Sequence, residues 1–440
     1  MDTIFALSTP PGKSGIAVIR VSGMQAAATL EALGVTPLPA PRRAMLAELR
    51  AAGVMIDKAL VLFFPAPHSF TGEDSVEYHV HGSRAVIRRL LETFSALPSL
   101  RPAEAGEFAR RAFLNGKMDL TAAEGLADLI DAETEAQRRQ ALRFMRGEGA
   151  AFYGDLRERM LEALALMEAY IDFPDEEIPP QALEHSAAQA QEIMAAIESQ
   201  LADGGVSERI RDGVRVAILG PPNTGKSSLM NLLAARDVAI VSEIAGTTRD
   251  VIEVHLDIGG YAVVIADTAG LRETGDRIER EGIARSLARA EAADLRIIVL
   301  DAGEPESWRE AELLLQENTL LLLNKTDQAM PSPLPVIGGH TPLPVSALRR
   351  TGIEALLAAL AERVAALAGG ESSFIARSRH RHHLTQALGH LRSYAAHAHA
   401  GLELRCEELR RAAVEIGKIT GSISVDEVLG QIFSRFCIGK

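Results

Sequence analysis

The stretch Gly220-Pro-Pro-Asn-Thr-Gly-Lys-Ser-Ser228 decides the fold of the central part of this chain. It matches the phosphate-binding pattern G-x-x-x-x-G-K-[ST] without a mismatch. The apolar residues Val214 and 216–219 before it predict a buried strand, and residues 228–235 after it predict the start of a helix. In a strand, glycine loop and helix of this order, backbone N–H groups surround a phosphate, Lys226 reaches the outer phosphates and Ser227 can bind Mg²⁺.

Four further motifs follow in the order of a GTPase domain. They are Gly246-Thr-Thr-Arg-Asp250, Asp267-Thr-Ala-Gly270, Asn324-Lys-Thr-Asp327 and Ser346-Ala347. Asp267 follows an apolar strand, as expected of an aspartate close to magnesium. The Asp327 carboxylate can accept both the ring and the amino N–H of guanine, whereas adenine offers no such pair of donors. The five motifs together predict a domain that binds and hydrolyses GTP.

The predicted nucleotide site draws on all five motifs. Its candidate residues are Asn223, Thr224, Gly225, Lys226, Ser227, Ser228, Ser242, Glu243, Ile244, Ala245, Gly246, Thr247, Thr248, Asp267, Thr268, Ala269, Gly270, Asn324, Lys325, Asp327, Ser346, Ala347 and Leu348. Leu271 stands where many GTPases carry the glutamine that orients water. Glu279 is a candidate for that task, with an exposed helix residue as the alternative. The Asn223 carbonyl suits a monovalent cation that replaces a missing arginine.

Composition limits the classes of protein that this chain can belong to. Its 440 residues suffice for two or three domains, and the net charge of −13 argues against a mainly electrostatic nucleic-acid binder. Two cysteines, Cys406 and Cys437, indicate a reducing compartment rather than a disulfide framework. The N-terminus lacks a signal-peptide pattern, and the longest apolar runs have the length of strands. We therefore expect a cytoplasmic protein without membrane spans.

Residues 1–117 predict an α+β domain. Strands are expected at 3–7, 15–21, 59–64 and 75–81. Gly12-Lys-Ser14 imitates the end of a phosphate loop, but Leu7 stands where the first glycine is needed, so we reject it.

The last of these predicted strands, residues 75–81, alternates strictly. Val76, Tyr78 and Val80 share one face, and Glu77, His79 and His81 share the other. From the pattern alone, Glu77 is interpreted as part of a solvated face. His79 and His81 could bind a metal ion, but two histidines without further ligands more often bind none.

Helical periodicity begins at Leu120 and returns at residues 182–201, 384–400 and 402–416. The nucleotide domain is therefore inserted into a helical one. The predicted domains are 1–117, 118–212 (helical, first part), 213–369 (GTPase) and 370–440 (helical, second part).

The one concentrated basic stretch is Arg377-Ser-Arg-His-Arg-His-His383. It is either a solvated helix start or a contact to RNA phosphates, and the pattern leaves both open. The histidines at 380, 383, 390 and 397 share a predicted helix face, but metal binding is a minor alternative. In the tail, Cys437 is either a reactive thiol beside Lys440 or a free surface cysteine.

Several stretches resemble one known family over nearly the whole chain. They are Asp2-Thr-Ile4, Thr9-Pro-Pro-Gly12, Arg20-Val-Ser-Gly23, Thr71-Gly-Glu-Asp74, Gly106-Glu-Phe108, Arg111-Ala-Phe-Leu-Asn115, Lys117-Met-Asp-Leu120, Ala123-Glu-Gly-Leu-Ala-Asp-Leu-Ile-Asp131 and Cys437-Ile-Gly-Lys440. With Asn223 and the other GTPase motifs, the chain resembles the MnmE (TrmE) family of tRNA-modifying GTPases of the TrmE-Era-EngA type. Pro221-Pro222 and Leu348 are small departures that touch no expected ligand.

The resemblance implies an architecture and a reaction. It implies an N-terminal folate-binding domain, a discontinuous helical domain, an inserted Ras-like GTPase domain and a homodimer. It also implies a partner, the FAD protein MnmG (GidA), in a heterotetramer. Together they would add an aminomethyl or carboxymethylaminomethyl group to C5 of the wobble uridine of certain tRNAs. A tetrahydrofolate such as 5-formyltetrahydrofolate would give the carbon.

The resemblance also assigns roles to residues. They are Arg20, Glu77, Lys117 and Lys440 for folate; Asn223, Ser242, Ile244 and Thr247 for K⁺; Ser227 and Thr248 for Mg²⁺; and Glu279, Lys226 and Cys437 for catalysis. This reverses the interpretation of Glu77 from the pattern alone. Two other functions compete with this one. A ribosome-assembly GTPase would bind rRNA and no folate, and a scaffold with a decayed site is disfavoured by the intact nucleotide motifs.

Overall fold

The computed structural model describes residues 2–172, 181–236, 238–239, 253–267, 292–370, 373–397, 401–423, 426–433, 436 and 439. The chain divides into two compact units. The first comprises residues 1–127, 144–158 and 413–440, and the second comprises residues 128–143 and 159–412. The domain limits expected from the sequence stay a prediction.

The first unit is built on a six-stranded sheet with the strand order β3-β4-β5-β2-β1-β6. Its strands are β1 Thr3–Leu7, β2 Ser14–Ser22, β3 Met45–Ala51, β4 Val54–Phe64, β5 Ser75–Gly82 and β6 Leu100–Pro102. All neighbours are antiparallel except β1 and β6. The four strands expected from the sequence are confirmed, and β2 and β4 are longer than expected.

Helices cover one face of this sheet. The helices are α1 Ala26–Ala32 and α2 Arg84–Ser95, and Ile19, Tyr78 and Phe94 lie fully buried in the core. The alternation expected in β5 is confirmed, since Val76 and Tyr78 are buried and Glu77 lies half-buried on the opposite face. Strand alternation thus fixes which residues of β5 can form a site on that opposite face.

The opposite side of the unit holds helices from distant parts of the chain. They are α3 Glu107–Leu114, the first turns of α4 Leu120–Asp131, and α15 Asp426–Phe433. Phe433 and Phe436 share a core with Ala109 and Leu120. Gly106 takes a left-handed φ of 66°, and a Cβ there would lie 2.2 Å from the Phe433 carbonyl oxygen. The C-terminal segment is therefore an integral part of the N-terminal unit.

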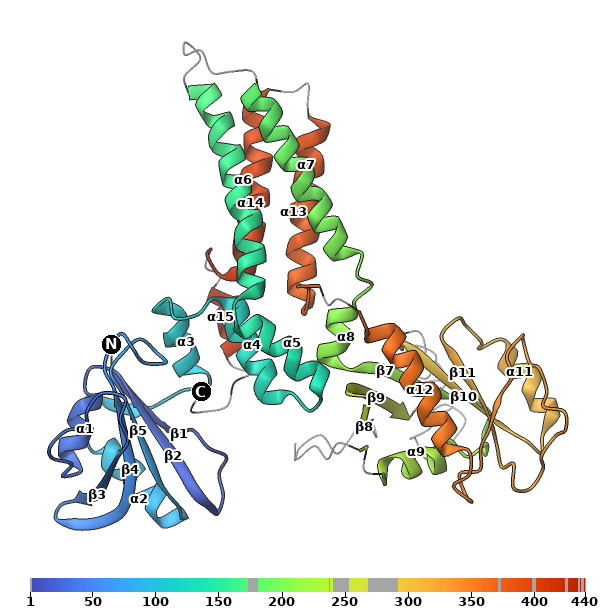
Figure 1. Cartoon of the computed structure of the whole chain (residues 1–440), viewed down its shortest axis with the longest axis horizontal. Helices are drawn as coiled ribbons and strands as arrows, with labels where there is room; N and C mark the ends of the chain where they lie inside the picture. The colour runs from blue at the N-terminus through green and yellow to red at the C-terminus, as the bar shows by residue number, and fades with distance from the viewer. Residues whose placement is uncertain are drawn as a thin grey trace, which may run out of the picture. The chain divides into compact units, whose positions relative to one another are not determined.

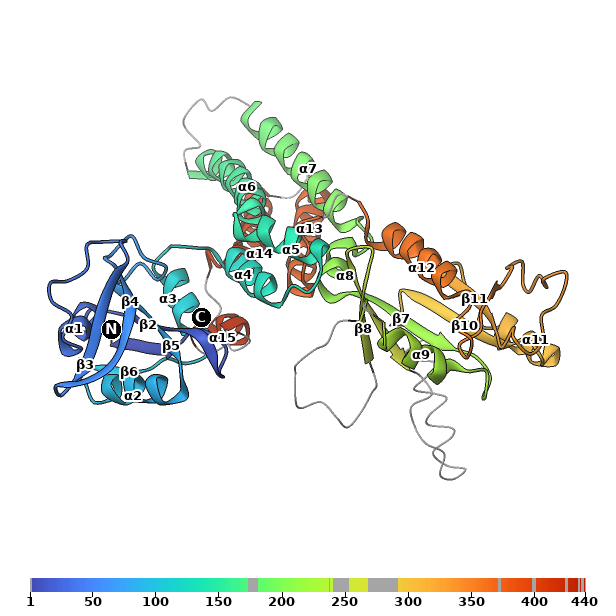
Figure 2. The ribbon, with the colours of Figure 1, turned by 60° about the horizontal axis from the view of Figure 1, so that its bottom comes forward.

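The second unit contains the sheet that the phosphate loop predicts, with the order β12-β11-β10-β7-β9-β8 (Figure 2). Its strands are β7 Val214–Leu219, β8 Glu253–Ile258, β9 Tyr261–Asp267, β10 Leu295–Asp301, β11 Thr319–Asn324 and β12 Leu343–Pro344. Only β8 and β9 pair antiparallel. The nearly unbroken apolar runs of β10 and β11 are typical of parallel strands that are buried on both faces.

The two faces of this sheet have separate cores. On one face, α9 Lys226–Ala234 and α12 Ile353–Ala368 pack against β7, β8 and β9. On the other, η1 Pro305–Ser307 and α11 Trp308–Glu312 begin a segment that packs Trp308 and Leu315 against Ile298 and Leu300. The short helix α8 Val206–Asp212 leads into β7. The carboxyl ends of the central parallel strands carry the loops that form the nucleotide site.

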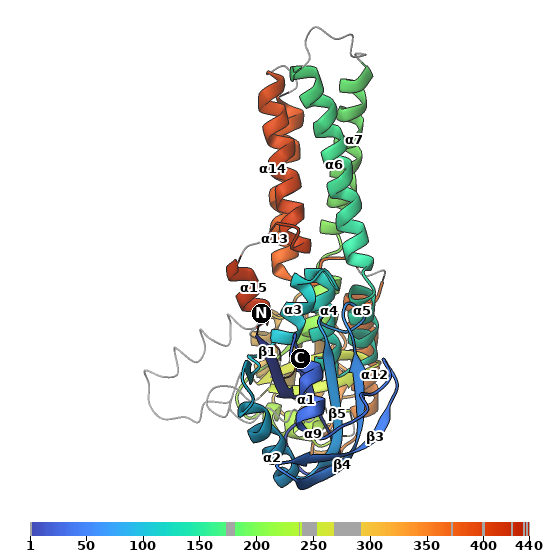
Figure 3. The same ribbon diagram turned by 90° about the vertical axis from the view of Figure 1, so that its left-hand side faces the viewer.

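Long helices pack side by side in the second unit (Figures 1 and 3). They are α7 Gln181–Leu201, α13 Ser378–Ala396, and the adjoining parts of α6 Glu148–Asp172 and α14 Leu402–Thr420. Ser186 of α7 lies 3.2 Å from the Ala163 carbonyl of α6 and 3.3 Å from the Tyr394 hydroxyl of α13. The expected helices are confirmed, together with α5 Glu135–Met145. No helix in the described ranges is long and apolar enough to cross a membrane.

Helix α13 begins at Ser378, six residues before the helix start expected at Leu384. Its first turns contain the basic stretch. Arg377 donates to Asp128 at 2.6 Å, and Arg381 donates to Asp203 and Glu208 at 3.1 and 2.8 Å. These ion pairs join α13 to α4 and α8. The sequence left two interpretations of this basic stretch open, a solvated helix start and a contact to RNA phosphates. Neither fits Arg377 and Arg381, because acidic residues distant in the sequence neutralise the charges of these two arginines.

Candidate functional site

The phosphate-binding loop lies between β7 and α9. Gly220 and Gly225 have φ angles of 139° and 95°, which side chains rarely adopt. A Cβ on Gly220 would lie 2.2 Å from the Val299 carbonyl oxygen, and one on Gly225 would lie 2.2 Å from Nδ2 of Asn324. The loop thus needs glycine at both positions for conformation and for space.

Lys226 starts α9 and folds back over the loop. Its Nζ donates to the carbonyl oxygens of Gly220 and Pro221 at 2.9 and 2.7 Å. These two hydrogen bonds hold the ammonium within the loop. When a nucleotide is bound, its phosphates would be the acceptors for this ammonium. Asn223 is exposed in the loop with a left-handed φ of 61°, and Ser227 is exposed in the first turn of α9.

Asn324 joins three loops of the site. Its Nδ2 donates to the Thr224 carbonyl at 2.8 Å, and its Oδ1 accepts from the Ala347 N–H at 3.0 Å. The residue is buried, so both polar atoms need these partners. In this arrangement Asn324 fixes the phosphate loop and the Ser346 loop to the end of β11, a bridging role that the sequence did not reveal.

Asp327 and Ser346, which the motifs predict to bind the base, contact each other. The Ser346 hydroxyl donates to Oδ1 of Asp327 at 2.5 Å and accepts from the Arg349 N–H at 3.0 Å. One carboxylate oxygen is thus oriented by the hydroxyl of a fully buried serine. A carboxylate held in one orientation is suited to accept two parallel N–H donors of a guanine.

Asp301, which the sequence analysis did not single out, belongs to the same edge. Its carboxylate lies 2.7 Å from Nζ of Lys325, and its Oδ1 accepts from the Gly303 N–H at 2.9 Å. The residue ends β10, beside Asn324 at the end of β11. The sequence pattern that could have identified Asp301 is an acidic residue at the carboxyl end of an apolar strand, because ligands bind at the carboxyl ends of parallel strands.

Part of the predicted nucleotide site lies outside the described residues. This concerns the segment 242–248, the segment 268–270 and Glu279, while the backbone of Asp267 ends β9 beside Ile218 of β7. Cys437 and Lys440 likewise lie outside the described residues. Leu348 is 75% exposed at the rim of the Ser346 loop.

A second cluster of polar side chains lies on the face of the first unit's sheet opposite α1 and α2. Nε and Nη2 of Arg20 donate to Oε1 of Glu77 at 3.0 and 2.9 Å, and the His79 ring lies 3.3 Å from Oε2. The register of β2 and β5 pairs Arg20 directly with Glu77. The Arg20 guanidinium also lies 5.4 and 5.7 Å from the ring centres of Phe70 and Phe108. A half-buried ion pair between aromatic rings can bind a flat polar heterocycle.

Lys117 and the end of the chain lie in the same unit. Nζ of Lys117 donates to the Pro67 carbonyl at 2.9 Å, in the loop between β4 and β5. The Ser8 hydroxyl donates to the Gly439 carbonyl at 3.0 Å, and a Cβ on Gly439 would lie 2.4 Å from the Leu7 carbonyl. The residue before Lys440 is therefore packed against the end of β1, the strand that neighbours Arg20.

A buried ion network beneath the 65–74 loop was not predicted. Arg111 is 5% exposed and donates to Glu107, Glu73 and Asp2 at 2.9, 3.1 and 2.9 Å. Arg101 completes it with a bidentate pair to Glu107 at 2.8 and 2.6 Å. Burial raises the pKa of Glu107, but hydrogen bonds from Arg101, the Glu104 N–H and Arg111 outweigh burial and lower it. The network anchors residue 2 to the 65–74 loop and α3.

The histidines have local partners. Nδ1 of His81 lies 2.8 Å from Asp57, and Nδ1 of His390 lies 2.7 Å from Glu408. His380 is buried, and Nδ1 of His397 lies 2.7 Å from the Ser393 carbonyl. Among the described residues no group of three His, Cys, Asp or Glu side chains could hold a metal ion.

Comparison with known proteins covers the whole chain. Residues 3–117 match the family of the GTP-binding protein TrmE N-terminus, and residues 120–437 match the MnmE helical domain. The chain is similar to the tRNA modification GTPase MnmE of Parvibaculum lavamentivorans, with 52% identity over 445 residues and 100% of both chains covered. The protein of the same name from Caulobacter vibrioides is 48% identical over 446 residues, again with full coverage.

A solved structure is also similar to part of the chain. The G domain of the T. maritima FeoB iron transporter is 27% identical over 35% of this chain and 98% of its own, with a TM-score of 0.27.

Proposed function

The chain belongs to the MnmE (TrmE) family of tRNA modification GTPases, and from this premise we propose that it modifies C5 of the wobble uridine of certain tRNAs. The added group is aminomethyl or carboxymethylaminomethyl, and an FAD-dependent partner, MnmG (GidA), shares the reaction. The observation that carries the proposal is 52% identity along the full length of a tRNA modification GTPase. A GTPase domain alone would serve a ribosome-assembly factor equally well.

GTP hydrolysis is proposed to depend on two cations. Ser227 and Thr248 would hold Mg²⁺, and Asn223, Ser242, Ile244 and Thr247 would hold K⁺. Support for the first comes from Ser227, exposed in the first turn of α9 beside Lys226. Support for the second comes from Asn223, exposed in the loop in a left-handed conformation. The cations supply positive charge where the transition state gains negative charge, and Glu279 would orient the water.

The N-terminal unit is proposed to bind a tetrahydrofolate, which supplies the one-carbon unit. Its ligands would be Arg20, Glu77, Lys117 and Lys440. The fit rests on the Arg20–Glu77 pair, whose guanidinium lies over the rings of Phe70 and Phe108, and on the packing of Gly439 against Ser8. A carboxylate and a guanidinium side by side match the donors and acceptors of a pteridine edge.

Cys437 is proposed to act in the modification rather than in GTP hydrolysis. Its neighbours Phe436 and Gly439 belong to the first unit, whereas Lys226 and Asp327 belong to the second. The protein is further proposed to work as a homodimer that assembles with MnmG into a heterotetramer.

Mass analysis of tRNA nucleosides tests the function. Cells that lack this protein should lose the C5-modified wobble uridines, and the intact gene should restore them. Unchanged nucleosides in the deletion strain would exclude the proposed modification. Equilibrium dialysis with a reduced folate then separates the alternatives, because an assembly GTPase should bind none. A Glu77→Gln variant should lose folate binding and keep GTP hydrolysis.

A further inference from the structure

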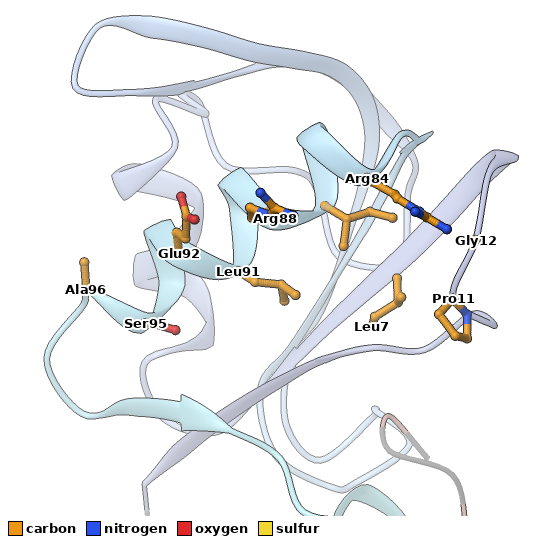
Figure 4. Close-up of a pocket in the computed structure, with 10 residues that line it drawn as sticks. Leu7, Pro11, Gly12, Arg84, Arg88, Leu91, Glu92, Ser95 and Ala96 are labelled. Atoms are coloured by element: carbon orange, nitrogen blue, oxygen red, sulfur yellow. The ribbon is translucent and has the colours of Figure 1, made fainter.

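An open pocket of about 1020 Å³ lies on the first unit, between α2 and the turn that joins β1 to β2 (Figure 4). Leu7, Pro11, Ile87 and Leu91 make most of its wall apolar. A hollow of this size falls near the upper end of the roughly 300–1,000 Å³ typical of ligand sites. The pocket is large enough for a nucleobase.

Two arginines border this hollow without an ion pair. Arg84 and Arg88 line it from α2, both exposed, and the Arg84 side chain extends toward the turn that carries Gly12 (Figure 4). The structure gives neither guanidinium a carboxylate partner among the residues it describes. Two neighbouring exposed guanidinium groups without a carboxylate partner create a local positive potential that attracts an anion, although the whole chain carries a net charge of −13.

The pocket is distinct from the cluster around Arg20. Leu7 packs against the core beneath α1 and α2, as Phe5 does. Arg20 and Glu77 alternate with the core residues Ile19 and Tyr78 and so lie on the opposite face of the sheet. Arg20, Glu77 and Lys117, the described residues of the proposed folate site, do not line the pocket.

We propose that this pocket is a docking surface for tRNA, an inference that rests on the proposed function. The side chains of Arg84 and Arg88 lie one helical turn apart on the same face of α2, so they can bind neighbouring backbone phosphates. The apolar hollow between them and Leu7 takes an unstacked nucleotide of a single-stranded loop. Single-stranded loops are the parts of RNA that proteins bind through splayed bases and through stacking on guanidinium planes.

The form of the pocket favours a polymer over a small molecule. Small-molecule sites enclose most of their ligand and bury the few polar groups that orient it. Here both arginines are exposed at the rim and the hollow is open, so an anion is bound at the surface while the attached base enters. Glu92 lines the hollow one turn beyond Arg88 and repels phosphate there, which directs the RNA backbone along the Arg84–Arg88 side.

The test measures binding of an unmodified tRNA transcript to the full-length protein over a series of salt concentrations. The double variant Arg84→Ala/Arg88→Ala should bind about tenfold more weakly at physiological salt. The slope of log affinity against log salt should become shallower by about 1 for each lost phosphate contact. The matched control is Arg89→Ala, since Arg89 is exposed on the same helix but does not line the pocket. Glu92→Gln should strengthen binding.

Each other outcome is informative. An affinity and slope equal to those of Arg89→Ala would overturn the docking surface, as would loss of self-association in the double variant, which would show that a second copy covers α2. Competition by phenyl phosphate as effective as by tRNA would mark a small-molecule site instead. Wild-type protein that binds no tRNA, in cells whose wobble uridines are modified, overturns the inference and leaves the proposed function intact. GTP hydrolysis by the double variant should stay normal.

Discussion

At the scale of single residues, side chains that the motifs predict to touch the nucleotide also bind one another. Asn324 uses both of its polar atoms to connect the phosphate loop to the Ser346 loop, and Ser346 orients Asp327. A buried amide with two protein partners costs free energy when either partner is lost. The residues of the base-recognition motifs therefore preorganise the site before GTP arrives.

Replacing Asp327 by Asn should weaken GTP binding without unfolding the protein. The substitution puts an NH₂ group or a single carbonyl where two guanine N–H donors need a carboxylate, so donors are left unpaired at a cost of about 1–3 kcal/mol or more. Titration with a fluorescent GTP analogue should show the weaker binding, while the free energy of unfolding stays within about 1 kcal/mol of wild type. Wild-type affinity for GTP in this variant would refute the assignment of Asp327 to the base.

The buried ion network makes stability depend on pH. The pKa of Glu107 is lowered in the folded protein, so its contribution is complete above the ordinary glutamate pKa of about 4.3 and is lost as pH falls through the folded value. Glu107→Gln leaves Arg101 and Arg111 short of a partner, and should cost about 3 kcal/mol at pH 7.

Urea unfolding curves between pH 7 and pH 3 test this prediction. The wild type should lose stability below about pH 4.5, and Glu107→Gln should lose less over the same range. The control is Glu48→Gln, whose exposed pair with Arg50 should contribute little. Parallel pH curves for wild type and Glu107→Gln would contradict the role of the network.

At the scale of elements, the loop between β7 and α9 requires glycine at two close contacts and carries Lys226 at its end. Asn223 takes a left-handed φ within it, which asparagine tolerates better than most residues. This conformation leaves its side chain exposed beside the place of the phosphates. Leu271 cannot orient the attacking water as a glutamine does. We propose that a cation bound by Asn223 supplies the positive charge that stabilises the transition state instead.

Potassium should accelerate GTP hydrolysis and sodium should not. A cation that faces developing negative charge is worth about a hundredfold in rate, as one well-placed donor is. Phosphate release in the two salts at matched ionic strength measures the effect, and Asn223→Ala should lose most of it while it still binds GTP. Equal rates in both salts would rule out the cation.

At the scale of the whole molecule, the two proposed sites lie in two different compact units. The GTPase motifs belong to the second unit. The Arg20 cluster, Lys117 and the C-terminal segment with Gly439 belong to the first. The two sites therefore share no residue, and a substitution in the tail should leave the nucleotide site intact.

Cys437→Ser should separate the two activities. Serine keeps the size of the side chain but is scarcely ionised at neutral pH, so it cannot replace a thiolate. Phosphate release by the purified variant should stay near normal, and nucleosides from cells that carry only this variant should lack the modified wobble uridine. Normal modification would make Cys437 a bystander. Loss of both activities would show instead that the tail is needed for folding or docking.

The sequence by itself determined the class of fold, the GTPase motifs and the family. Period-two and apolar patterns predicted β5, β7 and β11, because the side chains of a strand alternate or are buried on both faces. The phosphate loop was recognisable because its chemistry depends on a short continuous stretch. The family resemblance, which the full-length relatives confirm, also depended on continuous stretches.

Only the tertiary structure decided how distant residues combine. It placed Phe433 against α3 and Gly439 against the end of β1, paired Arg377 and Arg381 with acids of other helices, and joined Asn324 to Thr224. A solvated arginine and an ion-paired one have the same sequence pattern, because the partner lies far away in the chain. Periodicity reports which face of an element is buried, and only packing determines what that face meets.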